Sequence, residues 1–125
     1  MSEPIELTVV EEGGMRVVEG VPGRPFLVSG DDASRVVEAC LSNGVYAALL
    51  YADNLPSAFF DLSSGQAGAV LQKLRNYRVR LAVVCLPGSV QFSSRFGEMV
   101  AEERRQRYFG LFETRQAALE WLGGS

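Results

Sequence analysis

The chain has 125 residues, 47% of them apolar, and a formal net charge of −3, which is typical of a single folded domain rather than a disordered chain. The negative charge argues against nucleic-acid binding, which depends on Lys and Arg to neutralise phosphates. Histidine is absent, so a Ser-His-Asp or Cys-His nucleophile and a histidine-ligated zinc site are excluded. Neither GxxxxGK(S/T) nor a GxGxxG after a strand occurs, so the common nucleotide-binding motifs are missing. Catalysis by Lys, Tyr or carboxylates stays open, but we expect no cofactor, no metal and no catalytic residue.

The sequence also indicates where the protein works. No apolar run approaches the ~20 residues that span a bilayer, and the N-terminal MSEPIELTVVEEGG lacks the basic region of a signal peptide. We therefore expect a cytoplasmic protein with no membrane contact. Cys40 and Cys85 both lie in apolar surroundings, so we expect two buried free thiols.

The first third of the chain predicts a hairpin and a helix. β-Branched residues on either side of the glycine pair 13–14 predict strands over 5–10 and 15–20. After a loop, a serine or aspartate within 29–32 can cap the start of a helix that Gly44 ends. The apolar face of that helix would consist of Val36, Val37, Cys40 and Leu41.

The middle of the chain predicts a buried strand, a loop and a second helix. VYAALLYA, residues 45–52, is typical of a strand covered on both faces. The turn formers and aromatic residues of 53–62 predict a loop, and from Ser63 onward apolar residues recur at helical spacing. These residues are Ala67, Val70, Leu71 and Leu74.

The last third repeats the pattern of strand and helix. Strands are predicted over 79–86 and 108–112, and helices capped by a serine and by Thr114 over 93–106 and 113–122. The resulting order, ββαβαβαβα, predicts an α/β fold with a mixed sheet of four or five strands and about four helices. We expect one domain over 1–125.

The start of the second helix is the main candidate for a functional site. Serine there can cap the helix by accepting a bond from a free backbone N–H, but a helix N-terminus also suits a phosphate, whether bound or covalently attached. Acidic and amide side chains flank it after a predicted strand, where ligands of α/β sheets often bind and where turns also favour them. The candidate binding or phosphorylation residues are Asp53, Asn54, Asp61, Ser63, Ser64 and Gly65.

Two further features have a structural and a functional interpretation. Phe59 and Phe60 could form a docking patch, although paired aromatic residues are typical of a core. EERRQR, residues 102–107, is the only basic cluster. A solvated helix end explains it, and an anion or RNA contact is the alternative.

Two stretches carry a resemblance to known families. AFFDLSSGQAGAVLQKLRNYRVRLAVV, residues 58–84, and TRQAALEWL, residues 114–122, resemble a bacterial family known as domain of unknown function forty-one-eighty, which implies no established activity. The order of elements also resembles STAS domains, the sulfate-transporter and anti-sigma-factor-antagonist fold. In STAS antagonists an Asp-Ser-Ser-Gly-like motif opens the second helix and its first serine is a phosphorylation switch. This resemblance implies a STAS-like fold with Ser63 at the switch position, although here Leu62 separates Asp61 from the serines.

These observations lead to a functional expectation. We expect a non-enzymatic interaction or regulatory domain that presents the loop before the second helix, and the exposed face of that helix, to a protein partner, which could be a second copy of the chain. A serine switch at Ser63 or Ser64 is a secondary hypothesis. The alternative is a module that binds a small molecule or an anion at the same helix N-terminus. An enzyme that uses Asp53, Asp61, Lys73 or a tyrosine is a third class.

Overall fold

Strands and helices alternate along the chain in the order that the sequence predicted. The structure, a computed structural model, describes residues 7–12, 14–21, 32–88 and 90–123. Its strands are β1 (Leu7–Glu12), β2 (Met15–Gly20), β3 (Ala47–Tyr51), β4 (Arg80–Val84) and β5 (Phe109–Phe112). Its α-helices are α1 (Ala33–Asn43), α2 (Gln66–Asn76), α3 (Ser94–Arg105) and α4 (Arg115–Gly123).

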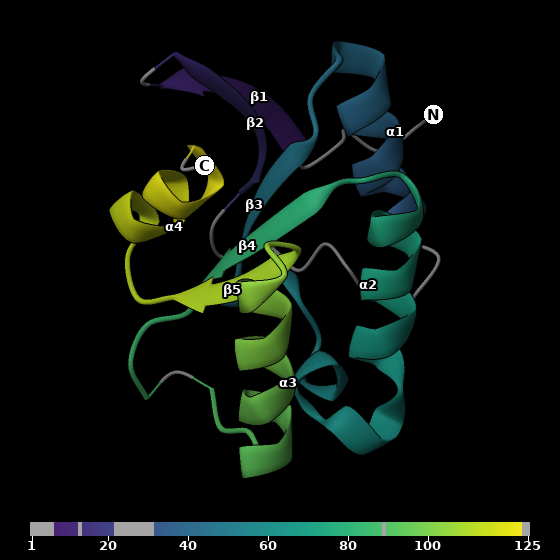
Figure 1. The fold of residues 1–125 in the computed structure, drawn as a ribbon, viewed down its shortest axis with the longest axis vertical. Helices are drawn as coiled ribbons and strands as arrows, with labels where there is room; N and C mark the ends of the chain where they lie inside the picture. The colour runs from purple at the N-terminus through teal and green to yellow at the C-terminus, as the bar shows by residue number, and fades with distance from the viewer. Residues whose placement is uncertain (1–6, 13, 22–31, 89, 124–125) are drawn as a thin grey trace.

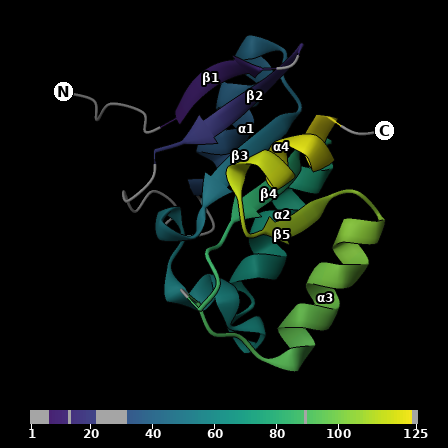
Figure 2. The ribbon, with the colours of Figure 1, turned by 90° about the vertical axis from the view of Figure 1, so that its left-hand side faces the viewer.

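The sheet has its five strands in sequence order, β1-β2-β3-β4-β5. β1 and β2 are antiparallel, and every later pair is parallel. Because strand–helix–strand crossovers are right-handed and all run in the same direction along this sheet, α1, α2 and α3 must cover the same face. Figures 1 and 2 show this arrangement, with α4 alone on the opposite face. The predicted α/β fold with a mixed sheet and four helices is confirmed.

The two faces of the sheet carry separate apolar clusters. The three-helix face is the larger and includes the fully buried aromatic rings of Phe59, Phe96 and Phe109. The α4 face is smaller, and there Ala118 and Leu122 of the helix pack on the sheet. The predicted apolar stripe of the second helix is buried against the larger cluster: Ala67, Val70, Leu71 and Leu74.

The structure corrects the predicted start of the second helix. α2 begins at Gln66 rather than Ser63, because Gly65 has a left-handed backbone with φ of +76° that separates α2 from a 3₁₀ turn at Leu62–Ser64. The predicted caps of the last two helices are confirmed. Ser93 Oγ accepts a bond from the backbone N–H of Phe96 at 3.2 Å, and Thr114 Oγ1 accepts one from Ala117 at 3.1 Å.

Other differences arise where elements end. The first strand lies at Leu7–Glu12 rather than 5–10, and residues 5, 6, 13 and 29–31 lie outside the described residues. Leu41 is 46% exposed, because the buried stripe of α1 runs through Val36 and Cys40 and the last turn directs Leu41 to solvent. Cys85 is half-buried rather than buried, because it follows the last residue of β4, Val84.

Three helices end in the same way before entering the sheet. The residue that closes each helix has a positive φ: Gly44 at +65°, Arg78 at +61° and Arg107 at +69°. The next backbone N–H then donates to a carbonyl of the helix's last turn, as from Val45 to Cys40 at 2.9 Å. Since β3, β4 and β5 are parallel neighbours, these three turns lie side by side at the N-terminal ends of the strands.

We expect Arg78→Gly to stabilise the protein. A residue other than glycine in the left-handed conformation costs the folded state about 1–2 kcal/mol, and glycine removes that cost. Glycine also makes the unfolded chain more flexible, which offsets part of the gain, so the free energy of unfolding should rise by about 0.5–1 kcal/mol. Arg78 is exposed, and Arg78→Ala removes the charge while keeping Cβ. Urea unfolding should therefore separate the two variants, and equal stabilities would contradict a strained backbone at this joint.

Candidate functional site

The predicted loop between β3 and α2 folds into three short turns and has an exposed outer side. It contains 3₁₀ turns at Ala52–Asn54, Ser57–Phe60 and Leu62–Ser64, and it lies beside the first turns of α2 and α3 (Figure 1). From beneath, Phe59 and Phe60 enter the core, where the ring of Phe59 makes edge contacts with neighbouring rings at centroid distances of 5.4–6.4 Å. The interpretation of these two residues as a docking patch is therefore wrong, and they anchor the segment instead.

Asp61 and the two serines organise the end of this segment. Asp61 Oδ1 accepts bonds from the backbone N–H of Ser63 at 3.1 Å and from Ser63 Oγ at 2.6 Å. Ser64 Oγ lies 2.6 Å from the carbonyl oxygen of Ala58 and accepts the N–H of Gln66 at 3.2 Å. Ser64 therefore caps the first amide of α2 from outside the helix, whereas Ser63 is bonded to Asp61 and remains exposed.

The six candidate residues do not all lie in one site. Asp61, Ser63, Ser64 and Gly65 are exposed together at the start of α2. Asp53 is exposed in the first 3₁₀ turn, at the other end of the segment. Asn54 is fully buried. Five of the six candidates are therefore exposed, at two places on the segment, and Asn54 is inside the protein.

Asn54 connects the ends of two parallel strands. Its Oδ1 accepts the backbone N–H of Tyr51 at 2.7 Å, and its Nδ2 donates to the carbonyl oxygen of Val21 at 2.8 Å. A Cβ on Gly20 would lie 2.5 Å from Asn54 Oδ1, so glycine is required at the end of β2 for this close approach. The role of Asn54 is thus to join β2 to β3.

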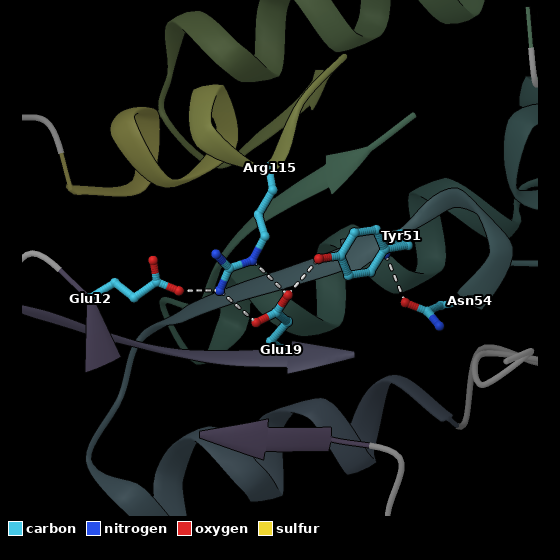
Figure 3. A network of polar contacts seen from close by, with 5 residues as sticks. All are labelled: Glu12, Glu19, Tyr51, Asn54 and Arg115. Atoms are coloured by element: carbon cyan, nitrogen blue, oxygen red, sulfur yellow. Dashed lines mark hydrogen bonds and ion pairs between the residues drawn. The ribbon is translucent and has the colours of Figure 1, made fainter. Parts of the chain in front are cut away.

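The sequence analysis missed a second cluster of polar residues. It lies on the α4 face of the sheet, beside the C-terminal ends of β2 and β3 (Figure 3). Arg115, the first residue of α4, donates from Nε to Glu19 Oε2 at 2.9 Å and from its terminal nitrogen to Glu19 Oε1 at 3.0 Å. The same nitrogen pairs with Glu12. Tyr51 Oη donates to Glu19 Oε2 at 2.5 Å. Together these bonds tie the hairpin, β3 and α4 to one carboxylate.

The chemistry of this cluster is that of a satisfied ionic network. Burial raises the pKa of the Glu19 carboxyl, but hydrogen bonds from Arg115 and Tyr51 and the charge of Arg115 outweigh it, so the pKa lies below its ordinary 4.5. Burial and the bond to Glu19 raise the pKa of Tyr51 to about 12. Neither group titrates near neutrality, where a general acid or base works best. The cluster therefore serves to fasten α4 to the sheet.

One sequence signal relates to this network, which is the alternation of side chains between the two faces of each strand. Glu12, Glu19 and Tyr51 follow Val10, Val17 and Leu49 at spacing two, which places all of them on one face of the sheet. Their common partner, Arg115, lies 96 positions beyond Glu19, and sequence alone does not reveal such a pairing.

Cavities and ligand groups complete the description of this edge. A mainly apolar cavity of about 300 Å³ lies past the ends of β4 and β5, lined by residues that include Cys85, Phe92 and Phe112. Over the described ranges, no three Cys, Asp or Glu side chains gather as metal ligands would. Among the helices of those ranges, none combines the length and apolar character needed to cross a bilayer.

We expect Ser64→Ala to destabilise the protein and Ser63→Ala to have less effect. Ser64 Oγ joins Ala58, Asp61 and Gln66, so its loss should lower the free energy of unfolding by about 1 kcal/mol. Ser63 bonds the exposed Asp61, and water can replace that contact. Equal losses on chemical unfolding would show that both serines are structural.

Glu19→Gln should weaken the protein at neutral pH and flatten its response to acid. A carboxyl whose pKa is lowered by folding stabilises the fold above its ordinary 4.5 and loses that contribution as the pH falls through its folded value. We expect a loss of about 1–3 kcal/mol at neutral pH from the missing charged hydrogen bonds.

The measurement is the free energy of unfolding as a function of pH. The difference between wild type and Glu19→Gln should shrink as the pH drops below 4.5. Glu38→Gln, on the exposed side of α1, serves as the matched control and should keep the wild-type profile. A constant difference at all pH values would contradict the ionic role of Glu19.

Comparison with known proteins places this architecture in a family. The family model described as "Domain of unknown function (DUF4180)" matches residues 12–122, a range that contains both the segment before α2 and the Glu19 network. No curated protein and no solved structure matches the chain. The resemblance of the segments 58–84 and 114–122 to this family is thereby confirmed. The chain belongs to the DUF4180 family of domains of unknown function.

Proposed function

We propose that this domain is a non-enzymatic interaction or regulatory module that binds a protein partner through residues 52–65 and the outer face of α2. The observation that carries the proposal is that this segment exposes polar side chains while two buried aromatic residues hold its backbone on the core. Phe59 and Phe60 fix its backbone in the core, while Asp53, Asp61 and Ser63 face solvent. A surface that is ordered before binding loses little conformational entropy on association, which favours recognition.

The adjoining face of α2 supports the same proposal. In α2, which the structure describes in full, the most exposed residues are uncharged, and the two charged residues, Lys73 and Arg75, are half-buried. The exposed residues are Gly68, Ala69, Gln72 and Asn76. Small side chains allow close approach of a partner, and uncharged ones avoid the desolvation penalty that excludes charge from interface centres. The anion-binding alternative is less favoured, because Ser64 Oγ already occupies the N–H of Gln66.

A STAS-like serine switch would regulate this surface. Ser63 Oγ is exposed and lies 2.6 Å from Asp61 Oδ1. Phosphate on Ser63 would add about −1.5 to −2 charges beside that carboxylate, which would break the bond and repel an acidic or apolar partner. The mixed sheet and the Ser-Ser-Gly before α2 support this fold assignment, in which phosphorylation turns binding off.

The test is site-specific photocrosslinking of the full chain in its native host. A crosslinker at Ala69 should capture a defined protein that the same crosslinker at Gln116, an exposed residue of α4, does not. Mass spectrometry identifies the products. Identical products from the two positions, or none from Ala69, would contradict the proposed surface.

The switch makes a separate prediction with the same assay. Ser63→Glu should reduce capture at Ala69 by about tenfold or more, whereas Ser63→Ala should retain it. Full capture by Ser63→Glu would remove the switch and leave the binding surface in place.

A further inference from the structure

A groove with a strongly positive lining lies between α3 and the end of α4. Its volume is about 570 Å³. The described residues that form it include Arg104, Arg105, Arg107 and Trp121, with no carboxylate among them. Ala101 and Gly97 lie one and two turns before Arg104 and Arg105 on the same side of α3, where their small size leaves the floor open.

Arg80, the first residue of β4, holds the two walls of the groove together. Its Nε donates to the carbonyl oxygen of Arg107 at 3.0 Å, and its terminal nitrogens donate to the carbonyl oxygens of Leu122 at 2.9 Å and Trp121 at 3.0 Å. Its guanidinium lies 4.8 Å from the centre of the Trp121 ring. The end of α3 and the end of α4 are therefore fixed relative to one another, and the groove is formed before any ligand arrives.

The groove collects more positive charge than the favourable interaction of cations with the C-terminal end of a helix would explain. Burial and the nearby charge of Arg107 lower the pKa of Arg80, whose Nε donates to the backbone carbonyl of Arg107. The Arg104 guanidinium lies over the ring of Phe112 at 4.7 Å, and Arg105 pairs with Glu102. In a chain with a net charge of −3, this is a local excess of the opposite sign.

Arg107 closes α3 in a left-handed backbone conformation. Its φ of +69° is one that L side chains rarely adopt, and glycine occupies the equivalent joint after α1 at position 44. An arginine here carries a backbone cost of about 1–2 kcal/mol. Because Arg78 has the same conformation after α2, this conformation belongs to the helix joint, and the charges of the groove carry the argument.

We propose that this groove binds a carboxylate-rich segment of a protein partner. Arginine forks match carboxylates in geometry and charge. The ring of Trp121 already packs against Arg80 and, at 5.4 Å, against Phe112, so the stacking platform that single-stranded nucleic acid uses is occupied. A second copy docking by the same groove would set arginine against arginine. The groove does not include residues 52–65, so the inference goes beyond the proposed function and does not rest on it.

The experiment uses the single tryptophan of the chain, Trp121, as a reporter in the groove. The full-length protein is titrated at low ionic strength with hexaglutamate peptide, with inorganic phosphate and with an oligothymidylate. We expect a saturable fluorescence change with the peptide that weakens with salt. Arg107→Gly, which also relieves the backbone, and Arg105→Gln should each weaken binding about three- to tenfold.

Arg95→Gln is the matched control, because Arg95 is an exposed residue in the first turn of α3 and outside the groove lining. It should bind the peptide like wild type. An equal loss in Arg95→Gln, no saturable change with the peptide, or tighter binding of phosphate or the oligonucleotide would each overturn the proposal. Crosslinking at Ala69 in the Arg107→Gly variant should be unchanged, so the two surfaces succeed or fail separately.

Discussion

The sequential order of the strands determines how the rest of the molecule is arranged. Because each right-handed crossover moves the chain one strand in the same direction, the three connecting helices all cover one face of the sheet. The other face is left to α4, a helix of nine residues. A helix that short has little stability of its own in water, so its position depends on the packing of Ala118 and Leu122 against the sheet and on polar contacts at its two ends.

Arginine makes those contacts at both ends. Arg115 at the start of α4 forms ion pairs with Glu19 and Glu12 of the hairpin. Arg80 at the start of β4 donates hydrogen bonds to the backbone carbonyls of Trp121 and Leu122 at the end of α4. Planar guanidinium groups suit this task, because each can bond two or three acceptors in a fixed arrangement. The same contact by Arg80 that holds α4 also forms the groove, so the stability of the smaller core and the shape of the basic surface have one cause.

The groove runs along α3 from Gly97 to Arg105, so both proposed surfaces adjoin α3. Its first turn carries Phe96, which packs on the anchored segment before α2, and its last turn supplies Arg104 and Arg105 to the groove. Twelve helical residues span about 18 Å. Partners at the proposed segment 52–65 and at the arginines of the groove would therefore contact different turns of α3.

Local patterns predicted the elements well, because hydrophobic spacing and capping residues act over a few positions. The strand and helix order and the buried face of α2 followed from them. The start of α2 did not, because the left-handed Gly65 decides it and a serine two residues earlier looked like a cap. The network around Glu19 and the groove around Trp121 were beyond sequence, since their members meet only after the sheet has formed.

The basic run 102–107 shows why residue type and residue placement answer different questions. In the sequence, its two glutamates offset its arginines and a solvated helix end is a sufficient explanation. In the structure the helix separates Glu103 from these arginines, whereas Glu102 stays paired with Arg105. Glu103 turns away to pair with Arg75 of α2, and Arg104 and Arg105 face the groove, where Arg107 joins them from beyond the helix end. Helical periodicity thus divides a nearly neutral segment into two surfaces of different charge, and the positive one lies where Trp121 and Arg80 have already formed a concave surface.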